Sequence, residues 1–219
     1  MLNIALDGPA GSGKSTIAKA ISKKLNVLYL DTGAMYRACG LYANRLGVNC
    51  KDEKAVNEII DNVKITVKYE GGAQRTYLDG EDVSEKIRQN EVSMFASDIS
   101  AHQKVREKLV ELQREIASGI DCVLDGRDIG THVLPNANYK FYVTASLEER
   151  TKRRFIELTM KGQAVDVDAL KAEIAQRDYN DSHRKFAPLR QAEDAILLDT
   201  SNMSVDEVVN FVLERINKG

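Results

Sequence analysis

The sequence has no tryptophan, three prolines and three cysteines, and it lacks long apolar runs. Cys39, Cys50 and Cys122 are odd in number and lack the C-x-x-C spacing of metal and redox sites, so we expect small packing residues rather than zinc ligands or disulfides. No stretch approaches the roughly eighteen apolar residues that cross a bilayer. We also find no internal repeat, low-complexity tract or linker.

Neither sign of charge dominates, because 31 Lys and Arg residues stand against 33 Asp and Glu residues. A net charge of −2 creates no global field for nucleic acid or an anionic membrane, so we predict neither partner and expect any anion binding to be local. The 43% hydrophobic content is enough to bury a globular core. Because a binding motif begins at residue 8, we expect no signal peptide and a cytoplasmic location. We also expect a monomer.

The most specific motif is a phosphate loop near the N-terminus. An apolar, strand-like run ends at Asp7, and residues 8–15 then fill every fixed position of the pattern G-x-x-x-x-G-K-S/T. Backbone N–H groups and the following helix hold polyphosphate in such loops, while the lysine contacts β and γ oxygens and the hydroxyl reaches Mg²⁺. A chance glycine-rich turn is the weaker alternative. The predicted nucleotide-binding residues are Gly8, Pro9, Ala10, Gly11, Ser12, Gly13, Lys14, Ser15 and Thr16.

Strands and helices alternate along most of the chain. Short apolar runs at 27–30, 120–124, 139–143 and 195–198 are typical of strands buried in a parallel sheet. Helical spacing or capping signals predict helices at 34–46, 52–60, 91–116 (one long helix or two in line), 147–160, 167–184 and after Ser204. We therefore predict an α/β fold, a doubly wound parallel sheet with the phosphate loop at its carboxyl edge.

The pattern changes between about residues 63 and 88. Ile65, Val67 and Tyr69 alternate with polar residues, Gly71 and Gly72 offer a turn, and 75–78 reads as a return strand. This predicts a small antiparallel β insert. A surface hairpin and a functional flap are equally compatible with the pattern.

Charged residues elsewhere suit a phosphate site. Asp125 follows a predicted strand, where a carboxylate can hold Mg²⁺ beside Ser15; a turn-forming role is the alternative. Arg150, Arg153 and Arg154 have the spacing of one helix face, which allows a movable anion clamp or a solvated basic face paired with nearby glutamates.

The predicted helix at 167–184 carries an apolar stripe that turns ionic. Arg177, Asp181 and Arg184 continue the side that begins with Val167 and Leu170. Because burying unpaired charge is costly, such a stripe favours a cleft that takes an anion. An internal ion-pair set that only stabilises the helix is the alternative.

Four segments together resemble bacterial cytidylate kinases: GPAGSGKST at 8–16, DTGAMYR at 31–37, DGRDIG at 125–130 and RDYNDSHR at 177–184. The match spans nearly the whole chain, and the last two segments are specific to that family. The resemblance implies one P-loop domain of the nucleoside monophosphate kinase type over 1–219. It also implies a monophosphate-binding insert at about 36–100 and a helical lid at about 150–165.

The resemblance further implies transfer of a phosphoryl group from ATP, with Mg²⁺, to CMP or dCMP. Kinases of the same fold for UMP, AMP or shikimate are the nearest rivals, and a GTPase is disfavoured because no Asn-Lys-x-Asp segment occurs. Thr32 stands where many relatives carry serine, and we expect little consequence. The resemblance implies phosphate contacts for Thr32, Arg37, Arg127, Arg177 and Arg184, ribose contacts for Asp181, and cytosine contacts for Ser97, Arg106 and Asp128. The motif and spacing arguments predict metal binding for Ser15 and Asp125, and we expect Lys14, Arg127, Arg153 and Arg154 to act in catalysis.

Two consequences follow from these implied roles. A straight helix turns roughly 100° per residue, which would send Ser97 and Arg106 to opposite sides. The helix must therefore break between them, and we expect the break at 100–102. A nucleoside monophosphate has a second pKa of about 6, so the attacking oxygen is already anionic and needs no general base. We therefore assign His102, His132 and His183 to packing or to the surface.

Overall fold

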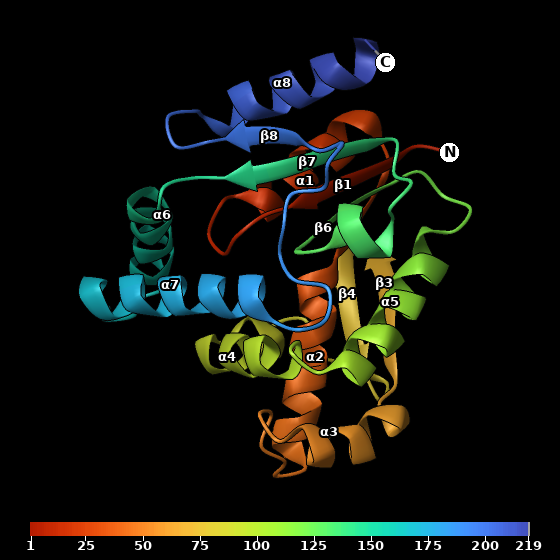
Figure 1. The fold of residues 1–219 in the computed structure, drawn as a ribbon, viewed down its shortest axis with the longest axis vertical. Helices are drawn as coiled ribbons and strands as arrows, with labels where there is room; N and C mark the ends of the chain where they lie inside the picture. The colour runs from red at the N-terminus through yellow and green to blue at the C-terminus, as the bar shows by residue number, and fades with distance from the viewer. Residues whose placement is uncertain (219) are drawn as a thin grey trace. The chain divides into compact units, whose positions relative to one another are not determined.

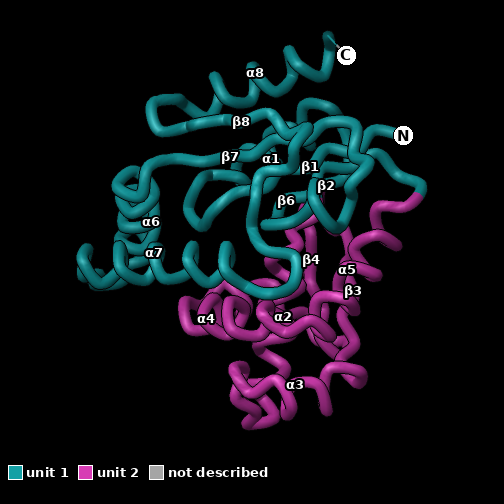
Figure 2. Tube along the Cα trace, viewed as in Figure 1, with its two compact units in different colours: residues 1–29, 119–219 teal, residues 30–118 magenta. Residues whose placement is uncertain are grey.

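The computed structural model describes residues 1–218. The chain separates into two compact units, Met1–Tyr29 with Gly119–Gly219 and Leu30–Ser118 (Figure 2). The sequence of the second unit is inserted into that of the first, so the first unit is built from two segments that are distant in the chain. Each unit is described separately below.

A five-stranded sheet with the order β2-β6-β1-β7-β8 organises the first unit (Figure 1). β1 lies between β6 and β7 and pairs with both in parallel, and β7 pairs in parallel with β8. This confirms the predicted α/β fold, and it places the end of β1 beside strands that arrive from later in the chain. The strands are β1 (Asn3–Asp7), β2 (Leu28–Asp31), β6 (Cys122–Gly126), β7 (Tyr139–Thr144) and β8 (Ile196–Asp199).

Helices of the first unit pack on this sheet or on each other. Ile17 and Ile21 of α1 and Val209 and Val212 of α8 share one buried core with β1, β6 and β7. α6 and α7 share a smaller core made by Leu158, Leu170 and Ile174. The helical elements are α1 (Lys14–Leu25), a π-helical turn η3 (Ile129–Val133), α6 (Leu147–Met160), α7 (Val167–His183) and α8 (Val205–Lys218).

The second unit combines helices with a three-stranded antiparallel sheet of order β3-β4-β5. The predicted hairpin is confirmed, and a third strand of two residues, which the alternation did not predict, follows the turn at Asp79 and Gly80. Asp31 and Asp52 cap α2 and α3 by accepting from the N–H groups of Ala34 and Ala55. The elements are α2 (Thr32–Arg45), α3 (Glu53–Ile59), η1 (Ile60–Asn62), β3 (Ile65–Glu70), β4 (Ala73–Leu78), β5 (Glu81–Asp82), η2 (Lys86–Arg88), α4 (Asn90–Ile99) and α5 (Gln103–Ala117).

Several element boundaries are shifted by one or two residues from the sequence-based prediction, and one predicted break is confirmed. The strand predicted at 120–124 lies at Cys122–Gly126, because Gly119 (φ +85°) turns the chain and the exposed Ile120 precedes the pairing of Asn3 with Cys122. The helix predicted to reach residue 184 ends at His183, and Arg184 takes an extended conformation. The predicted break at 100–102 separates α4 from α5.

The described residues contain no helix that is both long and apolar enough to cross a membrane. Cys39, Cys50 and Cys122 are buried free thiols, as the sequence predicted. Burial raises the pKa of the Cys39 thiol to about 12, so this residue packs as a neutral group.

Gly40 allows α2 and α4 to approach closely. A Cβ atom at this position would lie 2.7 Å from Cβ of Phe95 and 2.9 Å from its carbonyl carbon. We expect Gly40→Ala to lower the free energy of unfolding by about 1–3 kcal/mol, because the two helices must separate to admit the methyl group. Urea denaturation of the wild type and of Gly40→Ala tests this. A Gly40→Ala variant as stable as the wild type would contradict the prediction.

Candidate active site

The phosphate loop follows β1 directly and leads into α1. Gly8 has a φ of +147°, and a Cβ there would lie 1.9 Å from the carbonyl oxygen of Val143, so only glycine permits this close passage of the loop beside β7. Lys14 is the first residue of α1. Its amino group donates to the carbonyl oxygen of Pro9 (2.6 Å) and to the Ser12 hydroxyl (3.1 Å). These two hydrogen bonds therefore hold the Lys14 amino group against the phosphate loop.

Lys14 is almost completely buried, with 5% of its surface exposed. Burial, followed by the charge of Arg127, holds the pKa of the Lys14 amine well below its usual range, while Asp125 and Asp7 act in the opposite direction. Because negative charge favours the protonated amine, a polyphosphate at the loop would raise this pKa again. The surroundings of Lys14 thus suit a bound anion.

Oxygen groups suitable for a divalent cation lie beside the loop. The Ser15 hydroxyl donates to Oδ2 of Asp125 (2.6 Å), and the buried Tyr29 hydroxyl donates to Oδ1 of the same carboxylate (2.9 Å). Among the described residues no three His, Cys, Asp or Glu side chains form a metal cluster. Mg²⁺ needs no such cluster, since it commonly binds through one or two carboxylates together with substrate phosphates and water. Ser15 and Asp125 therefore fit this cation, and Tyr29 orients the carboxylate.

A buried network joins the segment after β6 to the end of α7. Nε of Arg127 donates to Oδ2 of Asp181 (2.8 Å), and Nη2 of Arg184 lies 3.5 Å from Oδ1 of Asp128. Nη1 of Arg184 also lies 4.0 Å from Oδ1 of Asp181. Burial alone would raise the pKa of Asp181, but the charges of Arg127, Arg184 and Arg177 hold it below its usual value. Four of the residues implied by the resemblance therefore meet in this network.

The α6 arginines serve different contacts. Arg150 donates to the carbonyl oxygen of Ala10 in the phosphate loop (3.0 Å) and pairs with Asp178 of α7 (2.5 Å). Arg153 donates to the carbonyl oxygen of Thr200 (2.6 Å), while Arg154 pairs with Glu157 (2.8 Å). The ion pair of Arg154 agrees with the solvated basic face, whereas the contact of Arg150 with the phosphate loop belongs to neither prediction. The role of Arg153 and Arg154 in catalysis stays a prediction.

The remaining predicted residues belong to the second unit. Thr32 begins α2 and is buried, and the guanidinium of Arg37 lies 3.8 Å from Asp31. Arg106, 1% exposed, donates to the carbonyl oxygen of Ser100 (3.2 Å) and stacks over the ring of Tyr36. Ser97 lies on α4, and its buried hydroxyl oxygen has no hydrogen-bond partner within the described part of the chain. The break after α4 lets Arg106 of α5 contact Ser100, and the shared contact of Ser97 and Arg106 with cytosine stays a prediction.

Sequence reasoning missed several residues that the fold places at these contacts. Asp7 accepts from the N–H groups of Ile129 (2.7 Å) and Gly130 (2.7 Å), and burial raises its pKa to about 6 despite those two hydrogen bonds. Asp178 lay inside the RDYNDSHR segment without an assigned role, and Tyr29 lay in an ordinary strand pattern. His102 packs as expected, with Nε2 2.7 Å from the carbonyl oxygen of Cys50.

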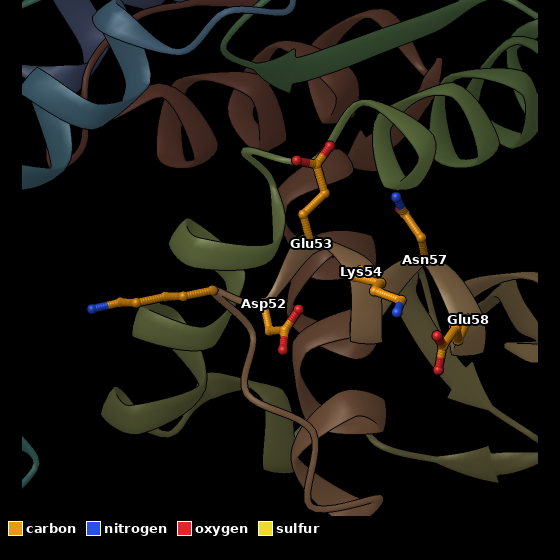
Figure 3. Close-up of a pocket in the computed structure, with 6 residues that line it drawn as sticks. Asp52, Glu53, Lys54, Asn57 and Glu58 are labelled. Atoms are coloured by element: carbon orange, nitrogen blue, oxygen red, sulfur yellow. The ribbon is translucent and has the colours of Figure 1, made fainter.

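A separate surface pocket of about 670 Å³ lies around the start of α3 (Figure 3). Its lining side chains are all polar or charged, and none belongs to the predicted site residues. They are Lys51, Asp52, Glu53, Lys54, Asn57 and Glu58. The pocket is therefore not part of the candidate active site.

Comparison with known proteins points to one family. The sequence model described as cytidylate kinase matches residues 4–218. The chain is 53% identical over 217 residues to a cytidylate kinase of Caldicellulosiruptor bescii, covering 99% of this chain and 96% of the relative. It is 49% identical over 218 residues to a cytidylate kinase of Lactobacillus johnsonii, covering 100% of this chain and 95% of the relative.

A solved structure adds support for the fold alone. The chain is similar to a shikimate kinase from Acinetobacter baumannii in complex with shikimate, with a TM-score of 0.50 and 14% sequence identity. The similarity covers 100% of this chain and 94% of that one.

Proposed function

Because the chain belongs to the cytidylate kinase family, we propose that it transfers the terminal phosphoryl group of ATP to the phosphate of CMP or dCMP, giving ADP and CDP or dCDP. The observation that supports this most strongly is the buried network of Arg127, Asp128, Asp181 and Arg184 in a family member that also carries a complete phosphate loop. The network supplies both anion-binding and hydrogen-bonding groups, which an acceptor nucleotide requires.

The chemistry needs positioning and charge neutralisation rather than a general base. The acceptor phosphate is already an anion at neutral pH. Loop N–H groups and Lys14 hold the donor phosphates, while Arg127, Arg177 and Arg184 bind the acceptor and transferred phosphoryl groups. Ser15 and Asp125 would hold Mg²⁺, whose contribution when bound is to neutralise charge on the β and γ phosphates. Arg153 and Arg154 belong to this proposal as lid residues.

We assign the contacts with the acceptor nucleotide to specific side chains. Thr32 and Arg37 contact the acceptor phosphate, Asp181 accepts from the ribose hydroxyls, and Ser97, Arg106 and Asp128 read cytosine. The segment at about 36–100 acts as the monophosphate-binding insert of a single domain, and the α6–α7 region at about 150–165 acts as a lid that excludes water. The monomeric state and the cytoplasmic location remain predictions.

A coupled assay of ADP release tests the function. We expect the highest kcat/KM for CMP or dCMP, with UMP, AMP and shikimate lower by more than about ten-fold, because a site of fixed donors and acceptors rejects a base that leaves them unpaired. The control contains ATP and no acceptor, and it should show little hydrolysis. Comparable kcat/KM values for CMP and AMP would contradict the proposal.

Base selection can be tested at Ser97. We expect Ser97→Ala to lower kcat/KM for CMP by roughly five-fold and to narrow the CMP:UMP ratio, since one hydrogen bond contributes about 1 kcal/mol. KM for ATP should not change. Ser93→Ala is a matched control, because Ser93 is a buried serine one turn earlier on α4. A CMP:UMP ratio that Ser97→Ala leaves unaltered would contradict the cytosine assignment.

A further inference from the structure

Asp128 occupies the N-cap position of the turn η3 but does not cap it. An aspartate at an N-cap normally accepts from the N–H of the second or third residue of the helix that follows. Here the Asp128 side chain makes no such hydrogen bond. Its Oδ1 lies 3.5 Å from Nη2 of Arg184 instead. The carboxylate has therefore turned from its own helix end toward the arginine network.

Asp7 supplies the missing cap from another element. Asp7 is the last residue of β1, and its two carboxylate oxygens accept separately from the N–H groups of Ile129 and Gly130, the first two residues of η3. Both distances are 2.7 Å, and Asp7 is 5% exposed. These N–H groups have no partner inside the turn, as at every helix start. Asp7 thus satisfies the donor on Gly130 that Asp128 would otherwise bind.

The local packing supports this close contact. A Cβ at residue 130 would lie 3.4 Å from Oδ2 of Asp7 and 3.0 Å from Cδ of Lys140, so glycine lets the backbone approach the carboxylate. Asp7 also pairs with Gly126 in the β1–β6 register. One side chain therefore connects the strand before the phosphate loop with the segment that carries Arg127 and Asp128.

We propose that Asp7 is a positioning residue for acceptor selection, which it performs by capping η3 so that the Asp128 carboxylate points to Arg184 and the acceptor base. Without this second acceptor, the N–H of Gly130 competes for the Asp128 carboxylate and draws it back into a conventional cap. Asp7 then acts on the base only through Asp128. The inference rests on the proposed function, because it assigns its consequence to the reading of cytosine.

Asp7→Asn is the direct test. Asparagine has a similar size but offers one acceptor oxygen, and its NH₂ group faces the second N–H donor. We expect kcat/KM for CMP to fall by about ten-fold and the CMP:UMP ratio to narrow, as loss of one hydrogen bond to a charged group permits. KM for ATP should stay within about two-fold. Asp7→Ser, which also keeps a single acceptor, is the second variant in case Asp7→Asn does not fold.

A double-mutant cycle separates positioning from general structural support. If Asp7 acts through Asp128, Asp7→Asn should lower kcat/KM for CMP much less in an Asp128→Ala background than in the wild type. Asp121→Asn is the matched control, because that carboxylate accepts from the N–H of Leu2 (2.7 Å) at the other end of β1 and should leave the CMP:UMP ratio unchanged. Additive effects of Asp7→Asn and Asp128→Ala on kcat/KM for CMP would overturn the proposal. Equal losses of kcat/KM for CMP and for ATP would also overturn it.

Amide hydrogen exchange provides a readout that does not depend on the substrate. Asp7→Asn should accelerate exchange at Ile129 or Gly130, while Asp121→Asn should not. If the wild type fails to phosphorylate CMP, the proposed function fails, although the exchange result can still confirm the cap. If CMP is phosphorylated and exchange at Ile129 and Gly130 is unchanged in Asp7→Asn, the inference about Asp7 fails by itself.

Discussion

Lys14→Ala should lower kcat by about 100- to 1,000-fold, the usual cost of removing a group that meets charge developing in the transition state. The Lys14 amine lies over the phosphate loop, bonded to Pro9 and Ser12, and it is the predicted contact for the β and γ phosphates. Because these contacts tighten as the phosphoryl group moves, the loss should appear mainly in kcat. Steady-state rates with saturating ATP and CMP measure it.

The same substitution should leave the fold intact. The pKa of Lys14 lies well below its usual value, so the protonated amine is disfavoured in the folded state and its removal relieves this cost at neutral pH. The melting temperature of Lys14→Ala should therefore not fall. Lys23→Ala is the control for loss of an exposed lysine from the same helix. Near-native turnover in Lys14→Ala would contradict the phosphate-loop assignment, and a collapsed melting temperature would contradict its purely functional role.

Asp181→Ala should lower the affinity for CMP by about 10- to 150-fold while changing KM for ATP little, because a charged hydrogen-bond acceptor contributes about 1.5–3 kcal/mol. The substitution removes the proposed ribose contact and also the partner of Arg127 at 2.8 Å. The loss should be smaller for dCMP, which lacks one of the ribose hydroxyls. Isothermal titration with CMP, dCMP and an ATP analogue measures the three affinities.

The lowered pKa of Asp181 also makes the stability of the fold depend on pH. The folded-state pKa of Asp181 is lowered, so its charge stabilises the fold at neutral pH. That contribution is lost as pH falls below about 4 and through the folded pKa. Asp181→Asn, which keeps the size of the side chain, is the control for packing. Equal losses of ATP and CMP affinity, or a large fall in melting temperature with intact CMP affinity, would favour the structural alternative.

Features encoded in contiguous residues were predictable from the sequence. The phosphate loop needs glycine, lysine and serine at fixed spacing, so Gly8, Lys14 and Ser15 identify it without any knowledge of the fold. Local signals also placed the caps at Asp52 and Ser204. The break between α4 and α5 was predicted from the roles that the resemblance implies for Ser97 and Arg106, and the local bonding of serine indicated its place. In each case the determining interactions join residues within one or two turns of each other.

The alternation of apolar strands and amphipathic helices also indicated the fold class. Parallel strands that are buried on both faces have continuous apolar sequences, and the pattern predicted four of the strands around β1. The two-residue strand β5 gave no detectable alternation, because only Glu81 and Asp82 take part in its pairing. Strands of four or more residues were therefore easier to predict than a strand of two residues.

Tertiary structure alone decided which charged groups meet. The sequence placed Asp181 in a set with Arg177 and Arg184 on its own helix, but its closest ion-pair partner is Arg127 from the segment after β6. Asp7, Tyr29 and Asp178 gave no signal, since each acts on a residue distant in the chain. Periodicity reports which side of an element is buried, whereas the partner on that side depends on strand order and register. For this protein, the sequence by itself determined the phosphate loop and its class of chemistry, and sheet packing determined the network that selects the acceptor in our proposal.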